Sequence, residues 1–395
     1  MQYLLYNKYE VYMKKKILTN NFLWVIIIGF FLGFFWVGLI HRGIFEIITD
    51  SITMVAWWMH ILLVLAAFVL GITVHELGHL FSCIFNKIKV KAVYIVLFVF
   101  VKKKIWTIKI LPKFLLLLGG AVLPIIDNVT NDDEFEKIRY KVSKVIGSGP
   151  ITSLVYMILV VLLLLVSLSL SWYLLAGILF WFTIMTVLLT VIIFMASKVS
   201  YKGLYGDFVA RSKILNDEIF AVDYLYSSSI LVENKTQEKF FWSKIVDILE
   251  SHNFNQNIHT KNLTIVYLEG VLFEAKEESE LIKNKMATKQ YFYNKNEEDM
   301  ILNYLLALYF INTDSVKNQF IIEKITQTKY EVDDKVKVYW QKLYNHLTLV
   351  EDNTEFLESK KNYYPTSTEW LYSPINDKIT IPTFELIKKN DNIVS

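Results

Sequence analysis

His75-Glu76-Leu77-Gly78-His79 stands near the end of an apolar run that extends from Ile52 to Phe85. Two histidines four positions apart lie on one face of a helix, so both rings can bind the same metal ion. The glutamate then lies beside the metal, where its carboxylate can take a proton from water and pass it to a leaving amine. The pattern therefore predicts a Zn²⁺ site suited to peptide-bond hydrolysis.

The apolar surroundings argue against a chance match on a solvated helix. Residues 52–74 contain no aspartate, glutamate, lysine or arginine, and about 20 such residues are enough to span a bilayer. Ionisable side chains at membrane depth are costly and are by default functional. We therefore place the predicted metal site inside a membrane helix.

The composition indicates a membrane part followed by a soluble part. The chain has 395 residues, of which 54% are hydrophobic, and these crowd into the first half. Four apolar runs are long enough to span a membrane: Phe22 to Ile40, Ile52 to Phe85, Ile151 to Leu170 and Trp172 to Ala196. The first run lies behind about twenty residues and is too long for the core of a signal peptide, so it is interpreted as an anchor.

The lysines suggest an orientation. Lys8 and the cluster Lys14 to Lys16 precede the first run, which places the N-terminus in the cytoplasm and the Arg42 to Ser51 loop outside. The lysines from Lys87 to Lys91 then emerge on the cytoplasmic side, so the metal lies toward that leaflet. His60 sits at the opposite end of the second run and is interpreted as an interfacial residue, not a ligand.

A strand-rich segment follows the second run. The stretches Val90 to Phe98 and Ile105 to Ile110 are β-branched and aromatic, and Lys102-Lys103-Lys104 separates them. This predicts a membrane-associated β-hairpin with a basic turn, whose edge could pair with an extended substrate. The alternative is a fifth membrane segment from Val90 to Val101. Leu115 to Gly120 then returns into the protein.

The next span is expected to follow a mixed-charge loop from Asp127 to Lys144. Gly149 and Pro150 open that span in this interpretation, because proline in the first turn of a helix costs no hydrogen bond. Ser153 lies one turn further along.

Three of these features together resemble a known family. They are HELGH in a membrane helix, Gly119-Gly120 closing a strand-rich loop, and Gly149-Pro150-x-x-Ser153 opening the next span. The combination looks like the site-2 protease family of intramembrane zinc metallopeptidases, peptidase family M50, over roughly Ile52 to Arg211. The resemblance implies that His75 and His79 are zinc ligands, that Glu76 is the catalytic base, and that Gly149, Pro150 and Ser153 position substrate.

The resemblance also implies a third ligand, an aspartate after the last core span. Asp207 is the candidate, although the family's Pro-containing Leu-Asp-Gly order is altered here to Gly206-Asp207. A carboxylate would complete a His₂-carboxylate site and leave a fourth position open. The alternative for Asp207 is a helix N-cap before Phe208. The acids Asp127, Asp132 and Asp133 are weaker candidates. For Ser153 the alternative is a small residue at a helix contact.

The second half of the chain is charged and shows helical spacing of apolar residues. Examples are Phe241, Ile245, Ile248 and Leu249, and later Leu302, Leu305, Leu306, Tyr309 and Phe310. A helical-repeat array is an option, but no clean 34-residue period is visible. The single Cys83 excludes an internal disulfide and is interpreted as a small buried residue. The net charge of +3 and the mixed charges do not indicate nucleic acid binding.

The expected fold is a polytopic α-helical membrane protein with a site-2-protease-like core, a membrane-associated β-hairpin and a C-terminal all-α soluble domain. The expected domains are residues 1–51 (first anchor), 52–211 (metallopeptidase core) and 212–395 (cytoplasmic helical domain, which can dock a protein partner). We place the chain as a multi-pass protein in a cell membrane, bacterial in view of its compact core, with both termini cytoplasmic.

The predicted function is zinc-dependent cleavage of a membrane-embedded peptide or single-span protein within the lipid bilayer. Such cleavage could release a membrane-tethered regulator or mature a small signalling or secreted peptide. The alternative is a non-catalytic membrane factor for peptide export or self-immunity that keeps the fold. The presence of Glu76 beside two histidines favours the enzyme.

Overall fold

The computed structural model describes residues 43–111, 120–201, 203–230, 232, 234–254, 257–288, 299–328, 334–359, 361–363 and 381–383. The expected first span, its flanking lysines and Gly119 lie outside these residues. By internal packing the described chain forms two compact units. We call them the membrane unit (43–78, 120 and 149–196) and the sheet-and-helix unit (79–111, 121–148 and the described residues from 197 onward). The predicted boundaries at 51/52 and 211/212 stay predictions.

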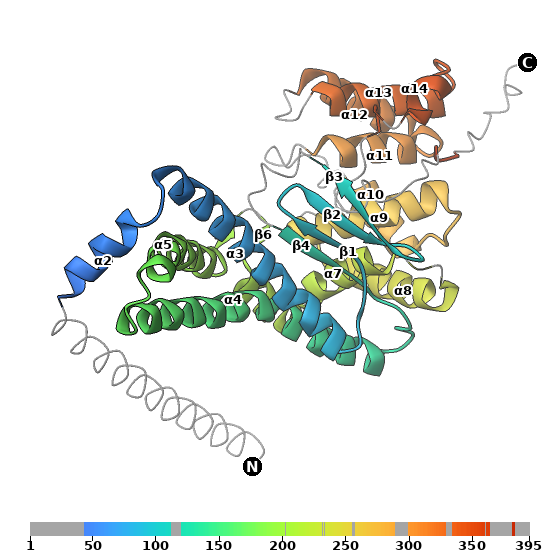
Figure 1. The fold of residues 1–395 in the computed structure, drawn as a ribbon. Coiled ribbons are helices and arrows are strands. Elements are labelled where there is room, and N and C mark those ends of the chain that lie inside the picture. The colour runs from blue at the N-terminus through green and yellow to red at the C-terminus, as the bar shows by residue number, and fades with distance from the viewer. Residues whose placement is uncertain are drawn as a thin grey trace, which may run out of the picture. The chain divides into compact units, whose positions relative to one another are not determined.

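Among the described residues, three helices are long and apolar enough to cross a membrane, and they overlap the second, third and fourth predicted apolar runs. They are α3 (Trp57–Phe85), α4 (Asp132–Ser169) and α5 (Tyr173–Ala196). A shorter helix, α2 (Ile44–Thr53), precedes them and packs on α5 in the membrane unit (Figure 1). The segment expected to be the Arg42 to Ser51 loop is thus largely helical.

The predicted start of the third span was wrong. Instead of a loop from Asp127 to Lys144, α4 begins at Asp132 and runs through Pro150 as one helix of 38 residues. Its first turn is capped because the Asn131 side chain accepts a hydrogen bond from the Glu134 N–H, and acidic residues there suit the helix dipole. Buried apolar residues then follow at helical spacing. One proline removes a single backbone hydrogen bond, which spanning helices tolerate.

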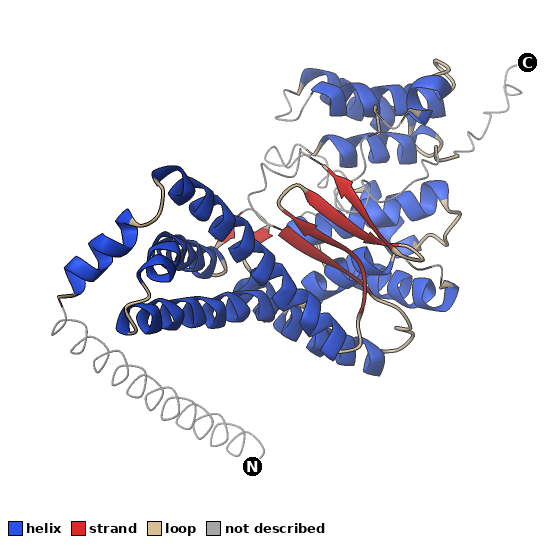
Figure 2. Cartoon of the chain, viewed as in Figure 1, coloured by secondary structure: helices blue, strands red, loops and turns tan. Residues whose placement is uncertain are grey.

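The strand-rich segment forms a four-stranded sheet in the order β3-β2-β1-β4, drawn as arrows in Figure 2. Its strands are β1 (Lys89–Ile95), β2 (Phe98–Lys102), β3 (Trp106–Ile110) and β4 (Gly120–Ile125). The segment is therefore β-structure as predicted, but it forms four strands instead of a two-stranded hairpin. The alternative of a fifth membrane segment is wrong. Val90 to Phe98 does not stay one strand because the chain turns at Val96, which has φ 55°, so that β2 pairs antiparallel with both β1 and β3.

After α5, a short antiparallel hairpin of β5 (Ser200–Tyr201) and β6 (Leu204–Tyr205) leads into helices. The helices are α6 (Asp207–Asn216), α7 (Glu218–Ser229), α8 (Lys235–Ser251), α9 (Ile258–Phe273), α10 (Glu280–Ala287), α11 (Met300–Ile311), α12 (Ser315–Gln327), α13 (Asp334–Leu347) and α14 (Thr354–Glu358). From Asp207 onward the described residues form helices and connecting segments only, as predicted.

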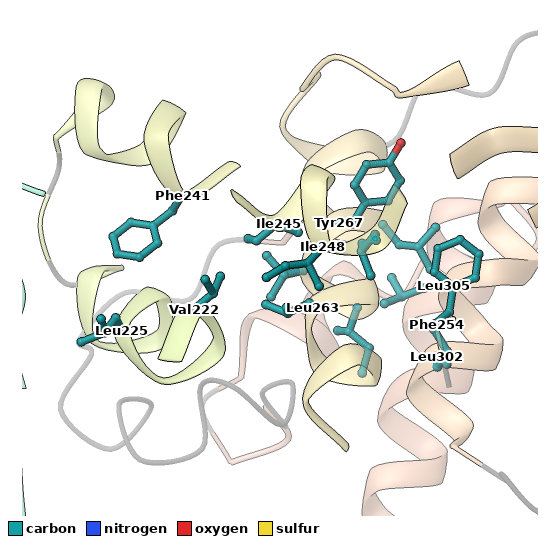
Figure 3. Packing of buried hydrophobic residues seen from close by; sticks show 14 of the residues in the cluster. Val222, Leu225, Phe241, Ile245, Ile248, Phe254, Leu263, Tyr267, Leu302 and Leu305 are labelled. Atoms are coloured by element: carbon teal, nitrogen blue, oxygen red, sulfur yellow. The ribbon is translucent and has the colours of Figure 1, made fainter. Parts of the chain in front are cut away.

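The sheet-and-helix unit has one large apolar core. Side chains of α7, α8, α9 and α11 meet in it, and Figure 3 shows Leu225, Phe241, Leu263 and Leu305 among them. The residues with predicted helical spacing on α8 and α11 are all buried. Val90 and Val93 of β1 join the same cluster, as does Cys83, so the sheet packs on these helices and the interpretation of the cysteine as a buried residue is confirmed.

Candidate metal centre

Helix α3 carries His75, Glu76 and His79 within two turns near its C-terminal end. Glu76 is only 3% exposed and His79 only 9% exposed. A continuous helix keeps the two histidines one turn apart, so the predicted common face exists. The three polar residues are thus set in a helix that is otherwise apolar enough to span a membrane.

The ring of His79 is oriented by the backbone of α4. Its Nδ1 lies 2.7 Å from the carbonyl oxygen of Val145, and a carbonyl only accepts hydrogen bonds. Nδ1 must therefore carry the hydrogen, which leaves the lone pair on Nε2. That second nitrogen lies 3.7 Å from Oδ2 of Asp207. An imidazole fixed through one nitrogen presents the other to a metal ion.

His75 has a comparable contact with a side chain. Its Nδ1 lies 3.1 Å from the hydroxyl oxygen of Ser153, which is 2% exposed and belongs to α4. A serine hydroxyl can accept a hydrogen bond from Nδ1–H, which leaves Nε2 of His75 for a metal ion. The structure therefore brings Ser153 to a histidine, where the sequence suggested a substrate contact or a plain helix contact.

Asp207 is the first residue of α6, directly after the β5–β6 hairpin. The N-cap residue is Gly206 and not Asp207, so the N-cap alternative for Asp207 is wrong. The turn is pinned by two backbone hydrogen bonds, from Gly206 N–H to the Val199 carbonyl and from Phe208 N–H to the Ser197 carbonyl, both 2.9 Å long.

Helix α6 is fastened to α4 at two places. The buried Arg139 guanidinium donates to the carbonyl oxygens of Ile214 and Leu215 at the end of α6. Arg211 packs over Gly147, where an added Cβ would come within 2.7 Å of the arginine side chain. Because α4 also supplies the Val145 carbonyl, one helix orients His79 and holds the helix that begins with Asp207.

Together, His75, His79 and Asp207 offer two ring nitrogens and a carboxylate oxygen that all lie within 4.8 Å of one another. Within the part of the chain that the structure describes, this is the group of three His, Cys, Asp or Glu side chains that could hold a metal ion. Two imidazoles and one carboxylate suit Zn²⁺ and leave a fourth coordination position open. The donor set and the orientation of His79 therefore fit a metal ion.

The remaining sequence candidates fall elsewhere. Asp127 pairs with Lys89 at 2.5 Å and Asp132 pairs with Lys244 at 2.7 Å, while Asp133 is exposed, and none of the three belongs to the ligand group. Gly149 and Pro150 lie in the turn of α4 before Ser153, and their role with substrate stays a prediction.

The sequence carried no sign of one contact at the site. The Val145 carbonyl contact was missed because every residue has a carbonyl, so only the packing of α4 on α3 selects it. His60 is 15 positions before His75, and its ring lies 5.9 Å from that of Trp181 in α5. This position agrees with an aromatic neighbourhood away from the ligands.

Comparisons with known proteins bear on the same region. Searches of curated proteins and of solved structures found no match. A scan against protein families matches residues 63–348 to Peptidase family M50, which covers most of the chain, including all three candidate ligands and Glu76. This match confirms the resemblance noted in the sequence, and the chain belongs to peptidase family M50, the site-2 protease family of membrane peptidases.

Proposed function

We propose that the protein is a zinc-dependent intramembrane endopeptidase that hydrolyses a peptide bond in a membrane-embedded peptide or single-span protein. The observation that carries this proposal is the group formed by His75, His79 and Asp207, with Glu76 buried beside it on a helix long enough to span a membrane. Family membership supports the reaction class, because M50 is a family of peptidases.

In this proposal the three side chains hold Zn²⁺, which when bound lowers the pKa of water and polarises a carbonyl group. The Glu76 carboxylate accepts a proton from the attacking water and delivers it to the leaving nitrogen as the peptide bond breaks. The low exposure of Glu76 keeps bulk water from competing for that proton.

The sheet offers a way to present substrate. A peptide bond inside a helix is shielded, so a membrane helix must unwind into an extended form before it is attacked. β3 and β4 are the outer strands of the sheet order, and an extended peptide can pair with such an outer strand. We propose that the substrate adds to one of these edges, and that the helices from α7 onward recruit or screen it.

The first experiment measures zinc by elemental analysis of the detergent-purified protein. We expect about one zinc per chain in the wild type and none in a His75→Ala, His79→Ala double variant. Asp207→Ala should retain less zinc than the wild type. Full zinc occupancy in Asp207→Ala would place the third ligand elsewhere.

The second experiment tests cleavage in cells. Membrane peptides are compared between cells that express the wild type and cells that express Glu76→Ala, which should keep its zinc and leave the substrate uncut. If carefully handled wild type holds no zinc and the two peptide sets are identical, the proposal fails and the non-catalytic membrane factor becomes the better interpretation.

A further inference from the structure

A chain of buried polar groups leads from the helical core to the hairpin that precedes Asp207. His259 on α9 and Asp223 on α7 are 6% and 7% exposed. The Nδ1 of His259 lies 2.7 Å from Oδ2 of Asp223, and its Nε2 lies 3.2 Å from the hydroxyl oxygen of Tyr205. Tyr205 is the last residue of β6, two positions before Asp207. None of these groups belongs to the ligand set.

The direction of these hydrogen bonds follows from the donors available. The Asp223 carboxylate accepts from Nδ1–H of His259, so Nε2 accepts from the hydroxyl of Tyr205. Asn262 donates a further hydrogen bond, 3.2 Å long, to the same Asp223 oxygen. Because these polar groups are hydrogen-bonded to one another, the Tyr205 side chain is held in one orientation and position relative to α7 and α9.

Ring packing adds to this constraint. The Tyr205 and His259 rings stack with centroids 5.5 Å apart and planes 27° from parallel, and Phe220 meets both rings edge-on. On α6 itself, the Lys213 ammonium lies 4.9 Å from the centre of the Tyr205 ring. Tyr205 is therefore in contact with the helix that Asp207 begins as well as with α9.

The hairpin turn fits closely against the same helix. Gly203 has φ +86°, a conformation that side chains rarely adopt, and an added Cβ would come within 2.9 Å of Ile258 at the start of α9. The neighbouring residue on α9 is His259. The turn and the strand end of the hairpin are thus both seated on the N-terminal turn of α9.

We infer that the hydrogen-bonded chain Asp223–His259–Tyr205 is a positioning device for Asp207. It fixes the β5–β6 hairpin, and with it the carboxylate of the third ligand, so that metal affinity depends on helices α7 and α9. These three residues act through Asp207 and do not touch the metal or the substrate. The inference rests on the proposed function, because it assumes that Asp207 is a metal ligand.

The test uses full-length protein in detergent and measures the Zn²⁺ dissociation constant by competition with a chromophoric chelator. Tyr205→Phe removes only the hydroxyl and keeps the ring, and Asp223→Asn changes the partner of Nδ1. Partners that orient a metal ligand typically contribute 10–100-fold in metal affinity. We expect zinc affinity to fall about 10-fold in each variant. The double variant should show no further fall, because both changes interrupt the same series of hydrogen bonds.

The matched control is Tyr267→Phe. Tyr267 is a buried tyrosine on α9, the helix that carries His259, and its hydroxyl accepts a hydrogen bond from the Ser279 N–H. This control should lower the thermal unfolding temperature about as much as Tyr205→Phe and leave zinc affinity unchanged. A second readout is the visible absorption spectrum of protein saturated with Co²⁺, which should change in Tyr205→Phe and stay as in the wild type in Tyr267→Phe.

The results distinguish failure of this inference from failure of the proposed function. Suppose that the wild type binds zinc, and that Tyr205→Phe has the same zinc affinity and an unchanged Co²⁺ spectrum. This result would overturn the inference and leave the proposed function standing. Wild type that binds no more zinc than the His75→Ala, His79→Ala variant would overturn both.

Discussion

Large apolar side chains are often exposed on the long helices of the membrane unit, whereas those in the core of the sheet-and-helix unit are buried. Leu163 in the apolar part of α4 is 56% exposed, whereas Leu305 in α11 is fully buried. Figure 3 labels Leu305 among the packed side chains of the core. Many large apolar side chains of α3, α4 and α5 share the exposure of Leu163. An exposed surface of this kind is stable in lipid and unfavourable in water.

Burial therefore has a different meaning in the two units. In the sheet-and-helix unit, buried leucines contribute stability and are expected. Helix α3 is apolar enough to cross a membrane, so its buried ionisable residues Glu76 and His79 are the ones that call for a functional reason. Function and stability should therefore respond to substitutions in different regions, and four measurements test this expectation.

The largest effect is expected for Glu76→Gln. The variant keeps the size of the side chain but removes the proton acceptor, so cleavage should fall by about 10²–10⁴-fold, the usual contribution of a general base. Zinc content and the thermal unfolding temperature should not fall. An unfolding temperature well below that of the wild type would show that Glu76 contributes to stability and would contradict this separation of function from stability.

Leu305→Ala should lower stability and leave the zinc content unchanged. Removing a buried leucine typically destabilises a protein by about 2–5 kcal/mol, because transfer energy is lost and a cavity remains. Unfolding of the full-length protein, followed by tryptophan fluorescence in denaturant, should show this loss, with zinc content unchanged in the folded state. Leu281→Ala, at an exposed site on α10, is the matched control and should change stability by less than about 0.5 kcal/mol.

Leu163→Asp tests whether the exposed surface of α4 faces lipid. An aspartate in the middle of a membrane helix costs about 3 kcal/mol relative to leucine, so membrane insertion should fall. The same change at Leu281 should have little effect, because that exposed leucine belongs to the other unit. Equal membrane insertion of the two variants, measured by carbonate-resistant membrane fractionation, would contradict a lipid-facing α4.

Ser153→Ala should have the smallest of the four effects. It removes the hydroxyl that contacts Nδ1 of His75, and loss of such a partner typically weakens metal binding 10–100-fold. Ser167→Ala is the control on the same helix, because its buried hydroxyl donates to the Leu164 carbonyl. Chelator competition should show weaker zinc binding in the first variant only. Equal affinities would leave Ser153 as a plain helix contact.

The local features of this protein follow from its amino-acid sequence. The His75 and His79 spacing, the three apolar runs that became α3, α4 and α5, and the apolar faces of α8 and α11 were readable because each depends on residues within a few turns. The residues at which helices begin were harder to predict from the sequence. Pro150 looked like a start, yet α4 continues through it, because the apolar face upstream keeps the helix packed.

Contacts between residues far apart in the sequence depend on the tertiary structure. It brought Asp207 within reach of His79, set Val145 and Ser153 beside the two histidines, and placed His259 against Tyr205. No local pattern encodes these contacts, since a carbonyl or a hydroxyl becomes a partner only when another element packs against it. Periodicity fixes which face of a helix is apolar, but the packing of whole elements fixes which polar groups meet.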